Sequence, residues 1–260
     1  MFKQEGSFWL YYVGIIIMFL VLFYIAEYMI NAGRPTAITT GSGSATTTTS
    51  ATPRVTLNST QSQGGNMVTY SSSSLYTAEF ATSLGVFNVT LFAKNAPNTV
   101  ANFIDLANSG FFNNSKLYKV IPYSYAQGGS PNNQPNGGPG YTIPDENDWD
   151  SLDYNEDLRV ELRQQGYQST KRLASVDISK YVLAMADPYP NSSGSQFYII
   201  LSDQINPVVK ALKGKAMVFG RVSDNYSILD EIATSEVNMS GGYPKPIQDI
   251  VIKSIKIYVK

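Results

Sequence analysis

The chain has 260 residues, of which 43% are hydrophobic and 12% aromatic, so it can bury one sizeable domain and still carry appendages. Its formal charge is -1 without a long basic run, which argues against binding to nucleic-acid phosphates. It contains no cysteine and no histidine, which excludes disulfides, Cys or His nucleophiles, Ser-His-Asp triads and Cys/His zinc sites. We expect no metal and no cofactor.

The N-terminal segment is strongly apolar. Residues 8–26, FWLYYVGIIIMFLVLFYIA, carry no charge, and as a helix they would span about 28 Å, close to the thickness of a membrane's hydrocarbon core. Aromatic residues gather toward both ends, as they do at membrane interfaces. We therefore predict a short segment over 1–7 and a transmembrane helix over 8–30, with a cleaved signal peptide as the alternative.

Small polar residues dominate the segment 31–67, as in TTGSGSATTTTSATP, and predict a flexible stalk without a core. Asn-x-Ser/Thr sequons occur at Asn58, Asn88, Asn113, Asn191, Asn225 and Asn238. Together with the stalk, the sequons favour a single-pass glycoprotein whose domain lies on the extracytoplasmic side of the cell membrane.

Residues 68–260 are expected to form one domain of short strands and two helices. A Leu-Gly turn divides a hairpin over 75–93, and a helix over 96–110 begins near Pro97 and ends at Gly110. Further strands are predicted over 181–186, 195–201, 216–222 and 249–259, and a second helix over 226–234. This pattern predicts a mostly β domain, built as a closed barrel with capping helices.

One cation stands out in residues 117–129, LYKVIPYSYAQGG. A strand that ends at the Gly128-Gly129 turn accounts for the apolar positions but leaves Lys119 unexplained. From the pattern alone, the simplest interpretation is a lysine on the solvent-exposed face of a half-buried strand.

Five segments occur in a characteristic order: APNTVANFIDLANSGFFNNSKLYKVIP, QGGSPNNQPNGGPGYTIPDE, YVLAMA, SSGSQFYIIL and VFGRV. In order and spacing they resemble the cyclophilin-type peptidyl-prolyl cis-trans isomerases, over about residues 75–260. The resemblance implies an eight-stranded antiparallel barrel capped by two α-helices. It also implies a groove that binds X-Pro segments of polypeptides and catalyses rotation about the X-Pro bond.

The resemblance also implies site residues. Lys119 stands where the family has a catalytic arginine, and Gln127 matches the glutamine that buttresses this cation. The implied substrate-binding residues are Gln196, Ala186, Asp187, Tyr198, Leu212, Tyr125 and Ser124. Lysine keeps the positive charge but lacks the planar fork of arginine.

Several positions depart from the family pattern. Ser124 replaces a large aromatic residue, Tyr125 a methionine and Asp187 an asparagine. Residues 147–180 form an insertion longer than the usual family connection, and we predict a short helix over 155–165 with Leu158 and Leu162 on one face. The insertion is either a solvated excursion or a lid or partner-docking element.

We predict that the protein is a membrane-anchored peptidyl-prolyl cis-trans isomerase (rotamase) that assists the folding of exported proteins. Its domain is expected to be monomeric, with activity reduced by the altered groove. The alternative is a non-catalytic module of the same fold that binds Pro-containing segments. A purely structural tether would explain the stalk but not the retained Gln127 and Gln196.

Overall fold

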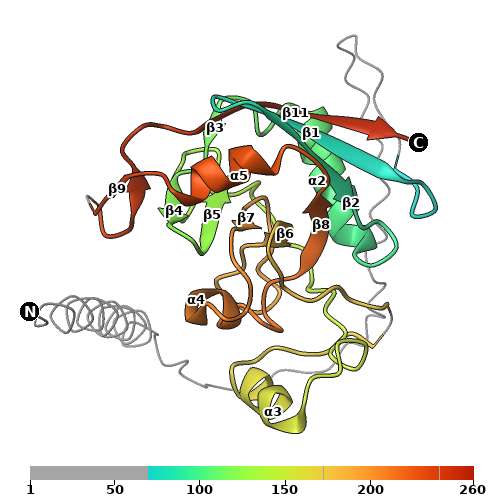
Figure 1. Cartoon of the computed structure of the whole chain (residues 1–260). Coiled ribbons are helices and arrows are strands. Elements are labelled where there is room, and N and C mark those ends of the chain that lie inside the picture. Colours follow the sequence, from blue (N-terminus) through green and yellow to red (C-terminus); the bar gives the residue numbers. More distant parts are fainter. Residues whose placement is uncertain (1–69, 172, 240) are drawn as a thin grey trace, which may run out of the picture. The chain divides into compact units, whose positions relative to one another are not determined.

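The computed structural model describes residues 70–171, 173–239 and 241–260 (Figure 1). The predicted N-terminal segment (1–7), transmembrane helix (8–30) and stalk (31–67) lie outside the described residues. Within the described ranges, no helix combines the length and apolar character needed to cross a membrane.

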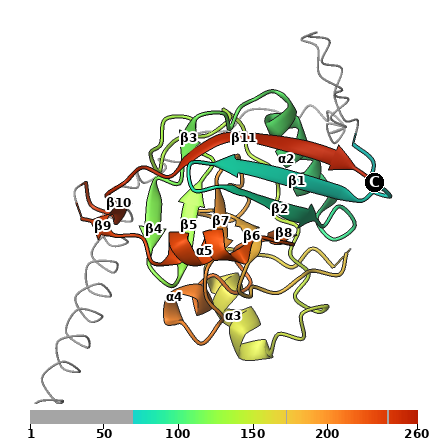
Figure 2. The same ribbon diagram turned by 45° about the horizontal axis from the view of Figure 1, so that its top comes forward.

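The strands of the described residues form a curled antiparallel sheet, visible in Figures 1 and 2. Its nine strands have the order β3-β11-β1-β2-β8-β6-β7-β5-β4, and β9 and β10 form a separate pair. The strands are β1 (Tyr76–Thr82), β2 (Val86–Leu91), β3 (Ser115–Lys116), β4 (Lys119–Ile121), β5 (Tyr125–Gly128), β6 (Val182–Met185), β7 (Phe197–Ile200), β8 (Val218–Val222), β9 (Val237–Asn238), β10 (Lys245–Pro246) and β11 (Val251–Val259).

The predicted hairpin and the four predicted later strands are confirmed. For the described residues, the expected closed barrel of eight strands is wrong, because the strands form a curled sheet of nine with β3 and β4 at its edges. The difference arises in the segment 115–121, whose first part, β3, pairs with β11 and whose second part, β4, pairs with β5. Between them, the Leu117 N–H donates to the Ile250 carbonyl over 2.9 Å. One continuous segment therefore runs between the two edges of the curled sheet.

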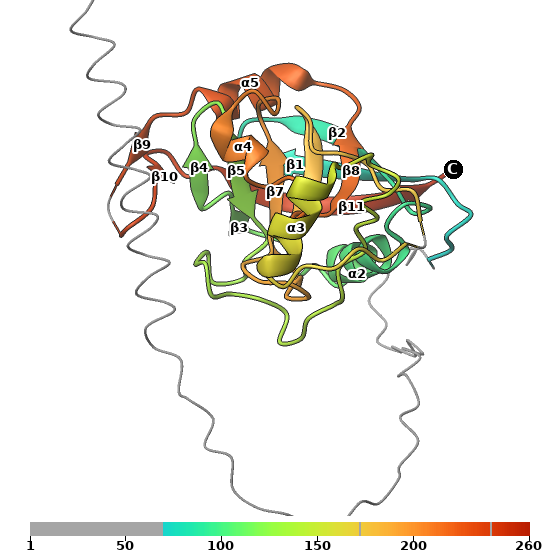
Figure 3. The same ribbon diagram turned by 90° about the horizontal axis from the view of Figure 1, so that it is seen from below.

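Four helices are found in the described residues: α2 (Pro97–Asn108), α3 (Glu156–Gln164), α4 (Pro207–Lys210) and α5 (Tyr226–Ala233). The structure confirms the two predicted helices as α2 and α5, and Figures 2 and 3 show them on opposite sides of the sheet. Helix α3 lies within the predicted range 155–165, whereas α4 was not predicted.

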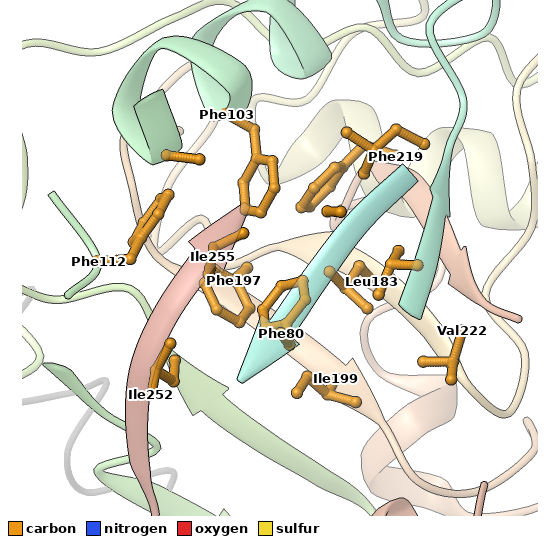
Figure 4. Packing of buried hydrophobic residues seen from close by; sticks show 14 of the residues in the cluster. Phe80, Phe103, Phe112, Leu183, Phe197, Ile199, Phe219, Val222, Ile252 and Ile255 are labelled. Carbon is orange, nitrogen blue, oxygen red and sulfur yellow. The ribbon is translucent and has the colours of Figure 1, made fainter. Parts of the chain in front are cut away.

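Aromatic rings fill the interior of the curled sheet (Figure 4). Phe80 of β1 stacks on Phe87 of β2 with their ring centroids 5.0 Å apart, and it meets Phe197 of β7 edge-on at 5.9 Å. From α2, Phe103 reaches Phe219 of β8 at 5.2 Å. These rings come from distant parts of the chain and are almost fully buried, so we call them and their apolar neighbours the main core.

A second apolar cluster covers the opposite face of β5, β6, β7 and β8. It consists of Tyr125, Ile178, Val182, Ala184, Ile200, Val209, Ala216 and Val218. Successive strand residues point to opposite faces, so these strands alternate between the main core and the second cluster. We call the face that carries the second cluster the outer face of the sheet.

The insertion has a small core of its own, built from Trp149, Tyr154, Leu162 and Tyr167. The Trp149 indole N–H donates to the Gly214 carbonyl over 3.2 Å. Gly214 has a φ of +75°, and a Cβ there would lie 2.4 Å from Leu162 Cδ1. The insertion is therefore packed against the segment that follows α4 (Figure 3).

The N-terminus of helix α2 is capped by a residue that is distant in the sequence. Its N-cap residue, Ala96, has no side-chain oxygen for the free backbone N–H groups of the first turn. Glu146 supplies this cap: its carboxylate accepts from the Asn98 N–H (3.1 Å), the Thr99 N–H (3.0 Å) and the Thr99 hydroxyl (2.9 Å). A buried negative charge at this end also complements the helix dipole.

We predict that Glu146→Ala lowers the free energy of unfolding by about 1–3 kcal/mol, because it leaves buried donors of α2 unsatisfied. Urea denaturation of the full chain measures this change. Glu231→Ala is the control, since Glu231 is exposed on α5. Equal stability losses in the two variants would show that the cap contributes nothing specific.

Candidate functional site

Three predicted site residues stand in one row across the sheet. Lys119 of β4 is paired with Gln127 of β5, which is paired with Tyr198 of β7. Directly paired residues of antiparallel strands place their side chains on the same face. The residues that alternate with them are buried in the main core: Val120, Ala126 and Ile199. Lys119, Gln127 and Tyr198 therefore lie on the outer face, and we call them the outer-face row.

Lys119 is a partly buried cation beside an aromatic ring. Its Nζ lies 5.5 Å from the centroid of the Tyr125 ring. Burial lowers the pKa of Lys119 from its usual value, and the nearby Tyr243 opposes this shift. Among the ion pairs of the described residues, none includes Lys119. Its ammonium group is thus free to donate to an acceptor brought by a ligand.

The two predicted glutamines are bonded to each other. Gln127 Nε2 donates to Gln196 Oε1 over 2.9 Å, and the Tyr118 hydroxyl donates to the same oxygen over 2.5 Å. Gln196 Nε2 donates in turn to the carbonyls of Pro135 (2.8 Å) and Gly137 (2.7 Å). The Gln127 side chain is therefore oriented by Gln196, and no hydrogen bond joins it to Lys119 in the described part of the chain.

Two tyrosines form an apolar wall next to the row. The rings of Tyr125 and Tyr198 lie 4.6 Å apart, tilted by 53°. Burial raises the pKa of both phenols, so both stay neutral over the physiological range. Leu212 packs against the same second cluster. The row thus combines a cation and an amide with an apolar surface of a kind that can contact an uncharged ring.

The remaining predicted residues have other neighbours. The buried Ser124 accepts a hydrogen bond from Asn206 Nδ2 (2.9 Å), which links it to the N-cap of α4. The Ala186 N–H donates to the Gln196 carbonyl over 3.0 Å, which joins Ala186 to the glutamine network. Asp187 follows Ala186 in the chain, and its carboxylate accepts from the Ser193 hydroxyl.

Sequence reasoning missed two tyrosines at this site. Tyr118 bonds Gln196, and its ring meets the Tyr243 ring edge-on at 5.8 Å. A continuous strand through Lys119 would have placed Tyr118 toward the main core, but the strand is interrupted between β3 and β4. Tyr243 lies in the connection between β9 and β10, and no local sequence signal links it to Lys119.

A cleft of about 650 Å³ lies beside α3 and α4. Its charged lining comprises Asp153, Asp157 and Glu161 from the insertion and Lys210, Lys213 and Lys215 from the α4 region. None of the outer-face row residues lines it. In the described ranges, no group of three His, Cys, Asp or Glu side chains is placed to hold a metal ion.

Comparison with known sequences identifies relatives of this chain. A family model described as "Cyclophilin type peptidyl-prolyl cis-trans isomerase/CLD" matches residues 77–257. Peptidyl-prolyl cis-trans isomerase-like 2 of Cryptococcus neoformans is 32% identical over 180 residues, which are 69% of this chain but only 27% of that protein. Peptidyl-prolyl cis-trans isomerase-like 1 of Homo sapiens is 28% identical over 177 residues, 68% of this chain and 88% of that protein.

Solved structures share the fold. The crystal structure of a cyclophilin type peptidyl-prolyl cis-trans isomerase from Cryptosporidium parvum is similar with a TM-score of 0.55 and 26% identity, covering 71% of this chain and 98% of that one. A structure of the same protein in the presence of the dipeptide Ala-Pro gives a TM-score of 0.54. The family model covers most of the described sheet and helices. The chain therefore belongs to the cyclophilin-type peptidyl-prolyl cis-trans isomerase family.

Proposed function

We propose that the chain is a peptidyl-prolyl cis-trans isomerase and that X-Pro segments bind over the outer-face row. The observation that carries this proposal is Lys119, a partly desolvated cation outside the described ion pairs, set beside the Tyr125 ring and opposite Gln127. Membership of the family supports the reaction class. The name of the Cryptosporidium parvum structure that includes Ala-Pro supports the substrate class.

The reaction makes few chemical demands. The barrier to rotation about an X-Pro bond is about 20 kcal/mol, and the twisted state loses amide resonance. Its nitrogen then becomes a better hydrogen-bond acceptor, so a cation aimed at this atom stabilises the transition state more than the ground state. Such a reaction needs no nucleophile and no metal, which agrees with a chain that lacks cysteine and histidine.

The proposed roles follow from position. Lys119 donates to the proline nitrogen, and Gln127, oriented by Gln196, holds the peptide backbone. Tyr125, Tyr198 and Leu212 contact the proline ring through the apolar surface of the second cluster. Further along the peptide, we assign backbone contacts to Ala186 and Asp187, and a place at the edge of the site to Ser124.

A lysine in this position predicts modest catalysis. Its ammonium can direct one donor at the twisted nitrogen but cannot hold nitrogen and carbonyl together as a guanidinium can. A module that binds Pro-containing segments without accelerating their rotation is the second candidate. Lys119 favours this second candidate, because a lysine is expected to stabilise the twisted bond less well than an arginine would.

We predict that Lys119→Ala lowers kcat at least tenfold, equivalent to about 1.4 kcal/mol of transition-state stabilisation, with a much smaller change in peptide affinity. Lys119→Arg should retain or raise activity, because it restores the fork. Exchange NMR on an Ala-Pro peptide with the full chain measures both.

Lys116→Ala is the matched control for these variants. Lys116 lies on β3 in the same segment, but its ammonium pairs with Asp249. An unchanged rate in both Lys119 variants, with the folded state intact, would reject the catalytic assignment. If peptide still bound, the binding module would remain as the function.

We also propose that the segment 8–30 anchors the chain in the cell membrane and that the domain is a monomer on the extracytoplasmic side, where exported proteins fold. The apolar run, the Ser/Thr-rich stalk and sequons such as the exposed Asn113 support this arrangement. We predict that protease added to intact cells releases the domain. Complete protection, at a dose that digests the domain in lysed cells, would reverse the topology.

A further inference from the structure

Two acidic side chains, those of Asp145 and Asp187, form hydrogen bonds with the loop that follows β6. Asp145 Oδ2 accepts from the Asn191 N–H over 2.9 Å, and Asp187 Oδ1 accepts from the Ser193 hydroxyl over 2.5 Å. The other oxygen of each carboxyl group, Asp145 Oδ1 and Asp187 Oδ2, is buried without a hydrogen-bond partner among the described donors. Both carboxyl groups are thus bonded to the same short segment, residues 191–193, and each affects the pKa of the other.

Two ionised carboxylates placed in this way would repel each other, and each would leave an unsatisfied buried oxygen. A single shared proton removes both costs, because a carboxylic acid can donate to the neighbouring carboxylate. Burial raises the pKa of both groups. Asp145 accepts from a backbone N–H, which favours its ionised form, whereas Asp187 is bonded only to a hydroxyl, so we place the proton on Asp187.

Among the described groups that affect the pKa values of this pair, none carries a positive charge that would stabilise a second negative one. Tyr198 of β7 senses the charge of Asp187, and burial keeps its phenol neutral. Glu146 is the next residue after Asp145, and its carboxylate is bonded to the N-terminus of α2. The buried carboxyl pair is therefore stabilised by the proton that the two groups share.

We propose that Asp187 is a positioning residue that stays protonated in the folded chain, donates to Asp145 and thereby holds the loop 187–193 beside the outer-face row. Backbone hydrogen bonds hold this loop at both of its ends. Ala186 donates to the Gln196 carbonyl (3.0 Å), and Ser193 forms a β-bridge with Ile143. The part of the inference that concerns peptide binding rests on the function proposed above.

An acid at this position makes the loop sensitive to pH. The neutral carboxyl of Asp187 has nearly the shape of an asparagine amide, and like the amide it can donate a hydrogen bond. An amide keeps its donor at every pH, whereas the acid loses its proton as the pH rises through its folded pKa. Repulsion between two carboxylates then replaces the bond that held the loop.

The sign of the effect on stability follows from the raised pKa. The carboxyl of Asp187 titrates near pH 4 in the unfolded chain and higher in the folded chain, so over this interval the folded state binds more protons. The contribution of Asp187 to the free energy of unfolding therefore falls as the pH rises from about 4 through its folded pKa. Asp187→Asn, which cannot titrate, should remove this contribution and make the slope shallower.

Three measurements on the full chain test the proposal. In ¹³C NMR spectra of the carboxyl carbons, one Asp should remain protonated at a pH where the exposed Asp carboxyls have ionised, and its signal should be absent from Asp187→Asn. The amide shifts of Ala186 and Asn191 should follow the same titration in the wild type and stay constant in the variant. Urea denaturation from about pH 4 to pH 9 should give a steeper fall in stability with Asp187 than with Asn at this position.

Asp157→Asn is the control, because it removes an exposed carboxylate of α3 and should leave all three profiles as in the wild type. If every Asp carboxyl titrates near pH 4, or if Asp187→Asn keeps the wild-type profiles, the inference is wrong.

None of these measurements needs enzyme activity. In the isomerisation assay, KM for the Ala-Pro peptide should rise several-fold with pH in the wild type and not in Asp187→Asn. An inactive wild type with the predicted titration would reject the proposed function alone.

Discussion

The packing of phenylalanine rings inside the curled sheet is the constraint on which the other features depend. Phe80, Phe103 and Phe197 come from β1, α2 and β7, and their rings touch in pairs within the main core. A strand that supplies such a ring cannot shift by one residue, because the shift would turn the ring to the opposite face. The packing of the main core fixes the register of these strands, and it therefore also fixes which residues lie on the outer face. Lys119, Gln127 and Tyr198 form a row because their neighbours in each strand are held in that core.

The outer face is supported in turn by elements outside the sheet. Helix α4 contributes Val209 to the second cluster, and the segment after it contributes Leu212 and Ala216. The insertion holds this segment through the Trp149 contact with Gly214, where a side chain could not fit against Leu162. This packing makes the insertion a structural support for one wall of the proposed site, rather than a solvated excursion. Whether it also binds a partner stays a prediction.

Much of the fold could be predicted because its signals are local. Alternating apolar residues marked the hairpin of β1 and β2, and Pro97 and Gly110 marked the limits of α2 closely. The features that were missed depend on residues far apart in the chain. The split between β3 and β4 follows from pairing with two different strands, and the cap of α2 comes from Glu146, far along the chain. In the site, matching positions to the family identified Asp187, but its interaction with Asp145 depends on two segments that are distant in the sequence.

The measurement that tests the central claim most directly is a titration of the ¹⁵N-labelled chain with the dipeptide Ala-Pro, followed by ¹H–¹⁵N NMR. If X-Pro segments bind over the outer-face row, the amide signals of Gln127, Tyr198 and Ala186 should move most, and those of residues lining the cleft beside α3 and α4 should stay in place. Shifts confined to that cleft, or none at saturating peptide, would contradict the account.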